Sequence, residues 1–230
     1  MLNHQINPFY CFISIPNEYK IMELVAHIVA HRFSLAAKKD ISVDIRCCNA
    51  ANTSPLADFN KSYVIYSLLH YLEQPNVEIS LIEKRLTKLC TQTIECHNGL
   101  PYFITIFQYL DRLNLQDDLW QRNAIIRRIR EINLIALRLS QSNMCGIIDL
   151  DSLFTRIGGQ NVRTDYTLKG VTAHQIAADF VSTVLIESHV NFAGNLDADT
   201  KDLLMSGGYE GILKRSSQRL LRDENNKTKN

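Results

Sequence analysis

Glycine is scarce in this sequence: there are 9 glycines among 230 residues, and none stands in the turn after the first expected strand. A dinucleotide site or a phosphate-binding loop needs glycines there, so that the backbone can approach the phosphates. Long apolar runs are lacking too, because none reaches the roughly 18 residues of a membrane span. An excess of charge of one sign is also lacking, since the formal net charge is +1. The sequence therefore predicts no nucleotide cofactor, no membrane insertion and no nucleic-acid partner.

The six cysteines are scattered, and no Cys-x-x-Cys spacing is present. That spacing is the usual mark of a zinc site, so we expect no metal. Adjacent cysteines such as Cys47 and Cys48 rarely bridge each other, which favours reduced thiols. The first residues, Met1 to Pro8, have neither the basic start nor the cleavage site of a signal peptide. Together these features predict a soluble cytoplasmic protein.

Short apolar runs alternate with longer stretches of helical period along most of the chain. Buried strands of a parallel sheet are continuously apolar, as FYCFISI at 9–15 and YVIYSLL at 63–69 are. The alternation predicts an α/β three-layer sandwich, with a mostly parallel five-stranded sheet, strands in chain order and helices on both faces. The expected strands are 9–15, 41–48, 63–69, 102–107 and 146–151, and the expected helices are 17–38, 76–95, 122–142 and 171–188.

The last stretch of the chain has a different pattern. Apolar residues flank a break at Gly207 and Gly208 (Leu203, Leu204, Met205, Ile212, Leu213, Leu220 and Leu221). So many apolar groups must pack against something, either the sandwich itself or, as we expect, another protein. The polar ending DENNKTKN is expected to be disordered. The sequence thus divides into an α/β domain (1–190), a helical appendage (191–222) and a polar tail (223–230).

In a parallel sheet, ligands bind beyond the carboxyl ends of the strands, so the loops that follow the strands hold the candidate functional residues. Ser14 ends the first run, where a serine is either a nucleophile or a helix cap. The polar residues at 49–54 either donate to a ligand or form a turn. His70 follows the third run and is either functional or a surface side chain. Asp149 and Asp151 share one face after the fifth run, where magnesium would need further oxygens.

A second group of candidates precedes the last long helix of the sandwich. Asp165 and His174 are the residue types of two thirds of a Ser-His-Asp triad, in which the Asp orients the imidazole that activates a serine. With Ser14 they complete the candidate catalytic set. The alternative for His174 is a surface position in the first turn of its helix. A basic cluster without interleaved aromatics predicts a solvated helix face rather than a nucleic-acid site (Arg122, Arg127, Arg128 and Arg130).

Three segments of the second half resemble the SGNH/GDSL hydrolase family: RRIREINLIALRLS at 127–140, GIIDLDSLF at 146–154 and TDYTLKGVTAHQIAADFVSTVL at 164–185. In that family a similar helix precedes a final strand that ends in Asp. An Asp-x-x-His pair and a closing helix follow, often with an alanine in the place of Ala177. The resemblance covers residues 8–190 and implies a flavodoxin-like sandwich of five parallel strands. It also implies an activity on acyl esters of lipids or sugars.

The motifs that define this activity are altered in the chain. If Asp165 takes the place of the family's Asp, the catalytic His falls on Leu168, and His174 lies six residues further on. The Gly-Asp-Ser block falls near Ser14, where the chain reads ISIPNEY, and the Gly-x-Asn-Asp block falls on 69–72, which reads LHYL. Loss of a nucleophile and its base removes most of the rate enhancement in such enzymes.

We therefore predict a non-catalytic SGNH-like domain that acts as a binding or assembly component of a larger protein complex, with the appendage meeting the partner. The alternative is an ester hydrolase or acyltransferase with an atypical site of Ser14, Asp165 and His174. A small-molecule-binding α/β protein of another lineage remains a third interpretation, because a fold does not fix a function.

Overall fold

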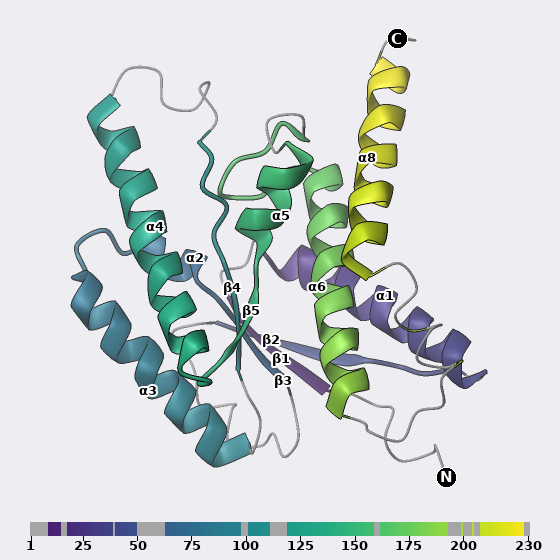
Figure 1. Ribbon diagram of the computed structural model, residues 1–230, viewed down its shortest axis with the longest axis horizontal. Coiled ribbons are helices and arrows are strands. Elements are labelled where there is room, and N and C mark those ends of the chain that lie inside the picture. The colour runs from purple at the N-terminus through teal and green to yellow at the C-terminus, as the bar shows by residue number, and fades with distance from the viewer. Residues whose placement is uncertain are drawn as a thin grey trace.

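The computed structural model describes residues 9–14, 18–38, 40–49, 63–97, 101–110, 119–158, 162–192, 199, 204 and 208–227. They form a five-stranded parallel sheet with helices on both faces (Figure 1). The strands are β1 (Phe9–Ser14), β2 (Asp44–Asn49), β3 (Tyr63–Ser67), β4 (Tyr102–Ile104) and β5 (Gly146–Ile148). The helices are α1 (Tyr19–Ala37), α2 (Leu69–Leu72), α3 (Ile79–His97), α4 (Leu119–Gln141), α5 (Leu150–Ile157), α6 (Val171–Phe192) and α8 (Gly208–Lys227). The expected α/β sandwich is confirmed.

The strands lie in the order β2-β1-β3-β4-β5, so the expectation that they follow chain order is wrong. Parallel connections are right-handed, and a sheet that grows in one direction only would therefore carry all its helices on one face. A chain that covers both faces must reverse its direction across the sheet. Here the reversal lies between β2 and β3, because β3 pairs with the side of β1 that β2 leaves open.

Side chains along β3 point alternately to the two faces of the sheet and enter two different cores. Ile65 belongs to the core beneath α1 and α6, whereas Val64 and Tyr66 belong to the core beneath α3 and α4. Figure 1 shows the two groups of helices on opposite sides of the strands. All three side chains are buried, which explains why this strand is apolar on both faces.

The first helix has the apolar spacing that a one-sided core requires. Its buried residues recur at intervals of three and four positions, the period of a single helical face (Ile21, Met22, Val25, Val29 and Phe33). The helix ends at Ala37 because Lys38 takes a left-handed backbone conformation, with a φ of 52°, and its N–H donates to the carbonyl of Leu35 at 3.4 Å.

The strand expected at 146–151 ends at Ile148, and a helix that the sequence analysis does not predict begins at Leu150. Asp149 is the cap of this helix α5, because its Oδ1 accepts a hydrogen bond from the backbone N–H of Ser152 at 3.0 Å. The same oxygen accepts from the hydroxyl of Thr105 at 3.0 Å. Asp149 therefore turns the chain from strand to helix at the carboxyl edge of the sheet.

A buried amide fixes helix α4 to the segment that follows β4. The side chain of Asn133, which is 4% exposed, accepts from the backbone N–H of Ile106 at 2.9 Å and donates to its carbonyl at 2.8 Å. The backbone N–H and carbonyl of Ile106 and the oxygen and nitrogen of the Asn133 amide thus all have hydrogen-bond partners in the core.

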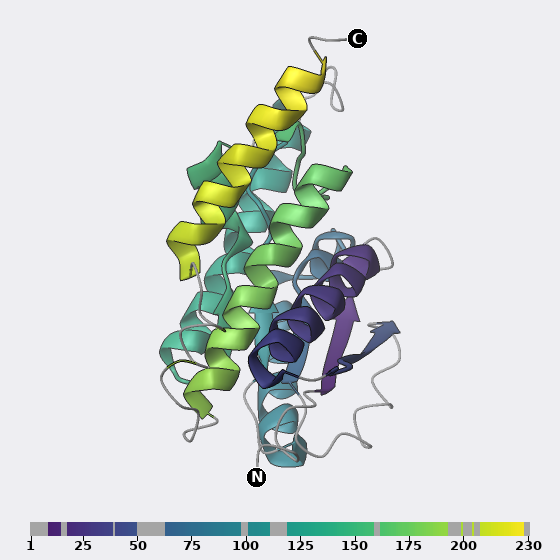
Figure 2. The ribbon, with the colours of Figure 1, turned by 90° about the vertical axis from the view of Figure 1, so that its right-hand side faces the viewer.

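The C-terminal helix α8 lies against α6 on the same face as α1 (Figure 2). Leu204 and Ile212 are 2% and 0% exposed and belong to the core of that face. The sandwich itself thus covers apolar residues that the sequence analysis assigns to a partner. Helix α8 also continues to Lys227, into the segment 223–230 that was expected to be disordered. Extending an existing helix by a turn is far easier than starting one.

Shortening Ile212 tests whether α8 packs on the sandwich in solution. We expect Ile212→Ala to lower the free energy of unfolding by about 2–5 kcal/mol, because it leaves a cavity between α8 and α6. Lys214→Ala, at an exposed position of the same helix, should change it by less than about 0.5 kcal/mol. Urea unfolding of both variants measures the difference. Equal, small effects of the two substitutions would contradict the packing of α8.

Candidate functional site

The carboxyl edge of the sheet brings the ends of all five strands together. The register places Ser14, the last residue of β1, beside Asn49, the last residue of β2. On the other side of β1, strand β3 ends at Ser67. The rest of the polar turn, 50–54, lies outside the described residues, and the structure places the backbone but not the side chain of Ser14. Ser14 is thus at the edge where its sequence position predicts it.

The connections from β1 and β3 leave toward opposite faces of the sheet, and this divergence is where open α/β sheets form their ligand crevice. Glu18, at the start of α1, and Ser67, at the end of β3, meet there by a hydrogen bond between their side chains. Glu18 is 5% exposed and Ser67 is 4% exposed. The Ser67 Oγ also accepts from the backbone N–H of Leu69, the first residue of the short helix α2, at 3.2 Å.

Glu18 is the most perturbed carboxyl group at this edge. Burial is the main cause that raises its pKa from 4.5 to about 7, the charge of Glu73 raises it further, and the hydrogen bond from Ser67 lowers it. A buried carboxyl group that changes its charge near neutral pH is a frequent mark of a functional site. No sequence pattern marks this pair. The only signal is position, since Ser67 ends an apolar run and Glu18 follows another closely.

Asp165 and His174 lie in the segment that returns to this edge after α5. Oδ1 of Asp165 accepts from both the backbone N–H and the hydroxyl of Thr167, so the carboxylate holds its own turn. The ring of His174 hydrogen bonds to the backbone of Leu168. Burial is the main cause that lowers the pKa of His174, and the charge of Lys20 on α1 lowers it further. His174 therefore lies beside the first turn of α1, the helix that follows Ser14.

Leu168 lies three residues after Asp165, where the sequence resemblance would put a catalytic histidine. Its side chain is 4% exposed and packs in the core beneath α1 and α6. Its backbone is left-handed, with a φ of 51°, and its N–H donates to the carbonyl of Asp165 at 2.9 Å. The turn from Asp165 to Leu168 thus directs the side chain at this position into the core.

The other candidates have structural partners. His70 hydrogen bonds to Nε2 of Gln74 at 2.7 Å, and burial is the main cause that lowers its pKa. Asp151 accepts from the backbone N–H of Gln108 at 2.7 Å and from its side-chain amide at 2.6 Å. Burial is the main cause that raises the pKa of Asp151. With Asp149 capping α5, these two carboxylates hold loops in place rather than share a face toward solvent.

Most of the basic cluster on α4 is engaged within the molecule. Arg127 pairs with Glu131 at 3.0 Å, and Arg130 donates to Oε1 of Gln108 at 2.9 Å. Arg128 donates to the backbone carbonyls of Gln74 and Val77, at 2.6 and 2.8 Å, and so fixes the loop before α3. Arg128 is therefore a structural side chain.

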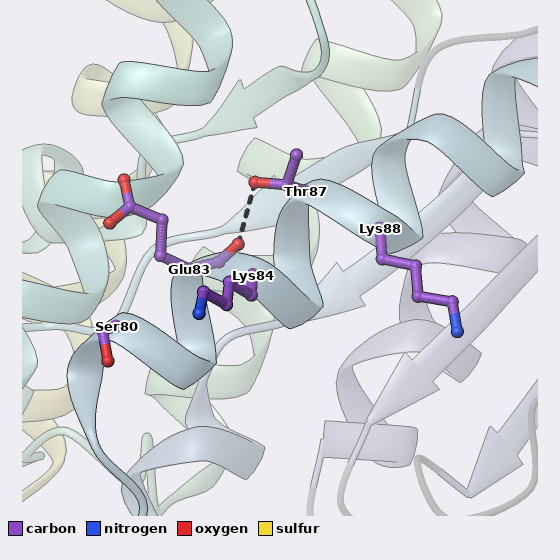
Figure 3. A pocket seen from close by; sticks show the side chains of 5 residues that line it. All are labelled: Ser80, Glu83, Lys84, Thr87 and Lys88. Atoms are coloured by element: carbon purple, nitrogen blue, oxygen red, sulfur yellow. Dashed lines mark hydrogen bonds between the residues drawn. The ribbon is translucent and has the colours of Figure 1, made fainter.

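A shallow surface hollow lies along α3, away from these residues (Figure 3). It is lined by side chains of one helix: Ser80, Glu83, Lys84, Thr87 and Lys88. The Thr87 hydroxyl donates to the backbone carbonyl of Glu83 at 2.8 Å. Within the described ranges, no three His, Cys, Asp or Glu side chains gather to hold a metal ion. No helix in the same part of the chain is long and apolar enough to cross a membrane.

Comparisons with known proteins give no matching family model and no matching curated sequence, but solved structures with a similar fold exist. The lipase/acylhydrolase from Enterococcus faecalis matches with a TM-score of 0.54 and 12% identity, over 78% of this chain and 95% of that chain. An acetyl xylan esterase, AlAXEase, matches with a TM-score of 0.53 and 12% identity, over 77% of this chain and 99% of that chain. These similarities confirm the fold that the sequence resemblance implies.

The raised pKa of Glu18 makes the stability of the protein depend on pH. Native Glu18 keeps its proton to a higher pH than it does in the unfolded chain, so the free energy of unfolding falls as the pH rises from about 4.5 to above 7. Glu18→Gln should abolish this pH-dependent fall in the free energy of unfolding, which amounts to about 3 kcal/mol. We expect the variant to equal the wild type near pH 5 and to exceed it in thermal stability near pH 8.5.

Glu23→Gln is the matched control, because Glu23 is an exposed carboxyl group of the same helix. Its stability should follow that of the wild type at both pH values. A Glu18→Gln variant that keeps the wild-type pH dependence would show that Glu18 is ionised in the native protein.

Proposed function

We propose that this chain, whose sandwich is the SGNH/GDSL hydrolase-like fold, is a non-catalytic form of that fold that acts as a binding or assembly component of a larger protein complex in the cytoplasm. The observation that carries the proposal is the placement of Leu168. If Asp165 takes the place of the family's Asp, the position of the catalytic base falls on this leucine, which is 4% exposed and directed into the core.

The surroundings of Leu168 support the same conclusion. Asp165 would orient the imidazole in a working triad, but its Oδ1 is taken up by two hydrogen bonds from Thr167. His174 bonds to the backbone of Leu168. A triad needs an Asp that orients the His and a His that reaches the serine, whereas Oδ1 of Asp165 holds Thr167 and the ring of His174 holds the backbone of Leu168.

One observation favours the second candidate function, an ester hydrolase or acyltransferase with an atypical site. A carboxyl group whose pKa lies near 7 is matched to general-base catalysis at neutral pH, and that of Glu18 is raised to about 7 beside the Ser67 hydroxyl. Against this stands the burial of both side chains, because an acyl ester would have to reach a hydroxyl that is 4% exposed. We therefore interpret the pair as a structural link between the start of α1 and the end of β3.

The place of α8 supports a role in assembly. Its first turns lie on the sandwich, where Ile212 is buried, while its last turns extend beyond the other helices of that face (Figure 2). A helix that projects from a domain can meet a partner through one of its faces. The cytoplasmic location rests on cysteine chemistry, because Cys90 and Cys145 meet as thiols that hydrogen bond to each other.

We expect purified protein to hydrolyse short p-nitrophenyl esters no faster than the buffer does, and a fluorophosphonate probe to leave its serines unlabelled. Both tests depend on an activated hydroxyl group, which the proposal denies. The matched variants are Ser14→Ala, Ser67→Ala and His174→Ala. Turnover and labelling that disappear in Ser14→Ala or Ser67→Ala would identify the nucleophile and establish the hydrolase instead.

A truncation tests assembly through α8. A chain that ends at Leu220 keeps Ile212, Arg215 and Arg219 but lacks the projecting turns. We expect its thermal stability to match that of the full chain, because the packed residues remain, while the complex that the full chain forms in its native cell is lost. Size-exclusion chromatography of affinity-purified material measures both forms. An undiminished complex from the truncated chain would contradict a role of the projecting turns.

A further inference from the structure

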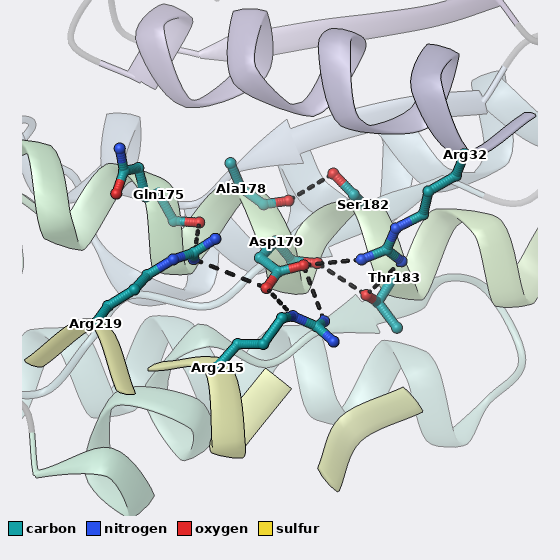
Figure 4. A network of polar contacts seen from close by, with 8 residues as sticks. All are labelled: Arg32, Gln175, Ala178, Asp179, Ser182, Thr183, Arg215 and Arg219. Carbon is teal, nitrogen blue, oxygen red and sulfur yellow. Dashed lines mark hydrogen bonds and ion pairs between the residues drawn. The ribbon is translucent and has the colours of Figure 1, made fainter. Parts of the chain in front are cut away.

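One carboxylate holds three helices together on the α1 and α6 face of the sandwich. Asp179 of α6 lies between Arg32 of α1 and two arginines of α8, Arg215 and Arg219 (Figure 4). The side chain of Asp179 is 4% exposed, while those of Arg32, Arg215 and Arg219 are 17%, 34% and 33% exposed. The acid is therefore buried, and the two arginines of α8 reach solvent.

Two of the three arginines use the hydrogen-bonding capacity of the carboxylate. Arg215 binds it through both oxygens, with Nε 2.8 Å from Oδ2 and Nη2 3.1 Å from Oδ1. Arg32 donates to Oδ1 at 2.9 Å and to the hydroxyl of Thr183 at 3.1 Å. Such charge-assisted, two-pronged contacts are the strong class of hydrogen bond, and they give Arg215 a fixed orientation.

Arg219 is differently placed. Its Nη1 lies 3.8 Å from Oδ2 of Asp179, beyond hydrogen-bond distance, and donates at 3.3 Å to the backbone carbonyl of Gln175. It also stands one helical turn after Arg215, and like charges at this spacing repel each other. The guanidinium group of Arg219 thus forms an ion pair with the buried carboxylate but no hydrogen bond to it.

The other charged group that faces this cluster offsets it only in part. Glu187 of α6 interacts with Arg32, but burial is the main cause that raises the pKa of Glu187. Burial is also the main cause that lowers the pKa of Arg32; Asp179 raises it, and the nearby charge of Arg215 lowers it. Three guanidinium groups therefore share one fully engaged carboxylate, and the positive charge in excess lies on the α8 side.

We propose that Arg215 and Arg219 form a binding site for a phosphate group at the junction of α6 and α8. The planar fork of a guanidinium group matches the spacing of phosphate oxygens, and two such groups one turn apart can bind the same anion. The phosphate supplies negative charge to guanidinium groups that otherwise share the single carboxylate of Asp179. Partial burial strengthens the attraction relative to open water.

Binding at this site depends on the docked position of α8. Arg215 is oriented by Asp179 of α6, and Arg219 by Gln175 of α6, so both ligand groups are in place only when α8 lies on α6. A ligand that binds only the docked form stabilises that form. Phosphate should thus hold α8 on the sandwich. The inference does not rest on the proposed role in assembly, and either can fail alone.

Thermal unfolding of the full chain in sodium phosphate and in sodium chloride, at equal ionic strength and pH, tests the site. Chloride screens the ion pairs of Asp179 and should leave Tm unchanged or lower it. Phosphate should raise Tm saturably, by roughly 3 to 6 °C at about ten times its Kd. Arg219→Gln should lose this rise. Lys214→Gln, which removes one exposed positive charge from the same helix, should keep it.

Two further measurements keep the outcome clear. Arg219→Lys keeps the charge without the fork, so its phosphate Kd, measured by calorimetry, should rise several-fold over wild type. A cooperative thermal transition of Arg219→Gln in chloride shows that this variant folds. If Arg219→Gln does not fold, the phosphate Kd of Arg219→Lys compared with that of the wild type tests the site instead. A phosphate effect that is absent from the wild type, equal in both arginine variants and the wild type, or lost equally in Lys214→Gln would overturn the proposal.

Discussion

Right-handed connection of parallel strands is the constraint on which the rest of this molecule depends. Because every crossover has the same hand, covering both faces of the sheet forces the chain to reverse beside β1. The reversal separates the paths that leave β1 and β3, and it places Glu18 next to Ser67 where those paths part. The two cores and the buried carboxyl group of Glu18 thus have one topological origin.

Apolar patterning made the existence of the strands and long helices predictable, and their order was predictable only by combining two rules. The strand runs at 9–15 and 63–69 are apolar because both their faces are covered, which local sequence can express. The sequence analysis expected helices on both faces and strands in chain order, and right-handed connections do not allow both. Likewise, the expected strand at 146–151 ignored the capping chemistry of Asp149, which begins α5 instead.

The sequence predicts where the candidate residues lie in the fold, but it does not predict the burial and contacts that set their chemistry. Ser14 and His174 lie near the edge where parallel sheets bind ligands, as their sequence positions predict. The pKa of Glu18 depends on burial beneath elements distant in the chain, so no local pattern marks it. The same holds for Asp179, whose partners lie 147 and 36 residues away. Burial by elements distant in the sequence decides whether a polar side chain is solvated or holds several elements together.

The left-handed turn at Leu168 has a consequence for any substitution at that position. A histidine in place of this leucine would enter the core beneath α1 and α6, because the turn directs the side chain there. The imidazole would then be buried among apolar groups, which disfavours its charged form. Directing a side chain at this position out of the core would require the turn from Asp165 to be rebuilt as well as the residue to be changed. The backbone conformation of the turn thus limits what a single substitution at Leu168 can alter.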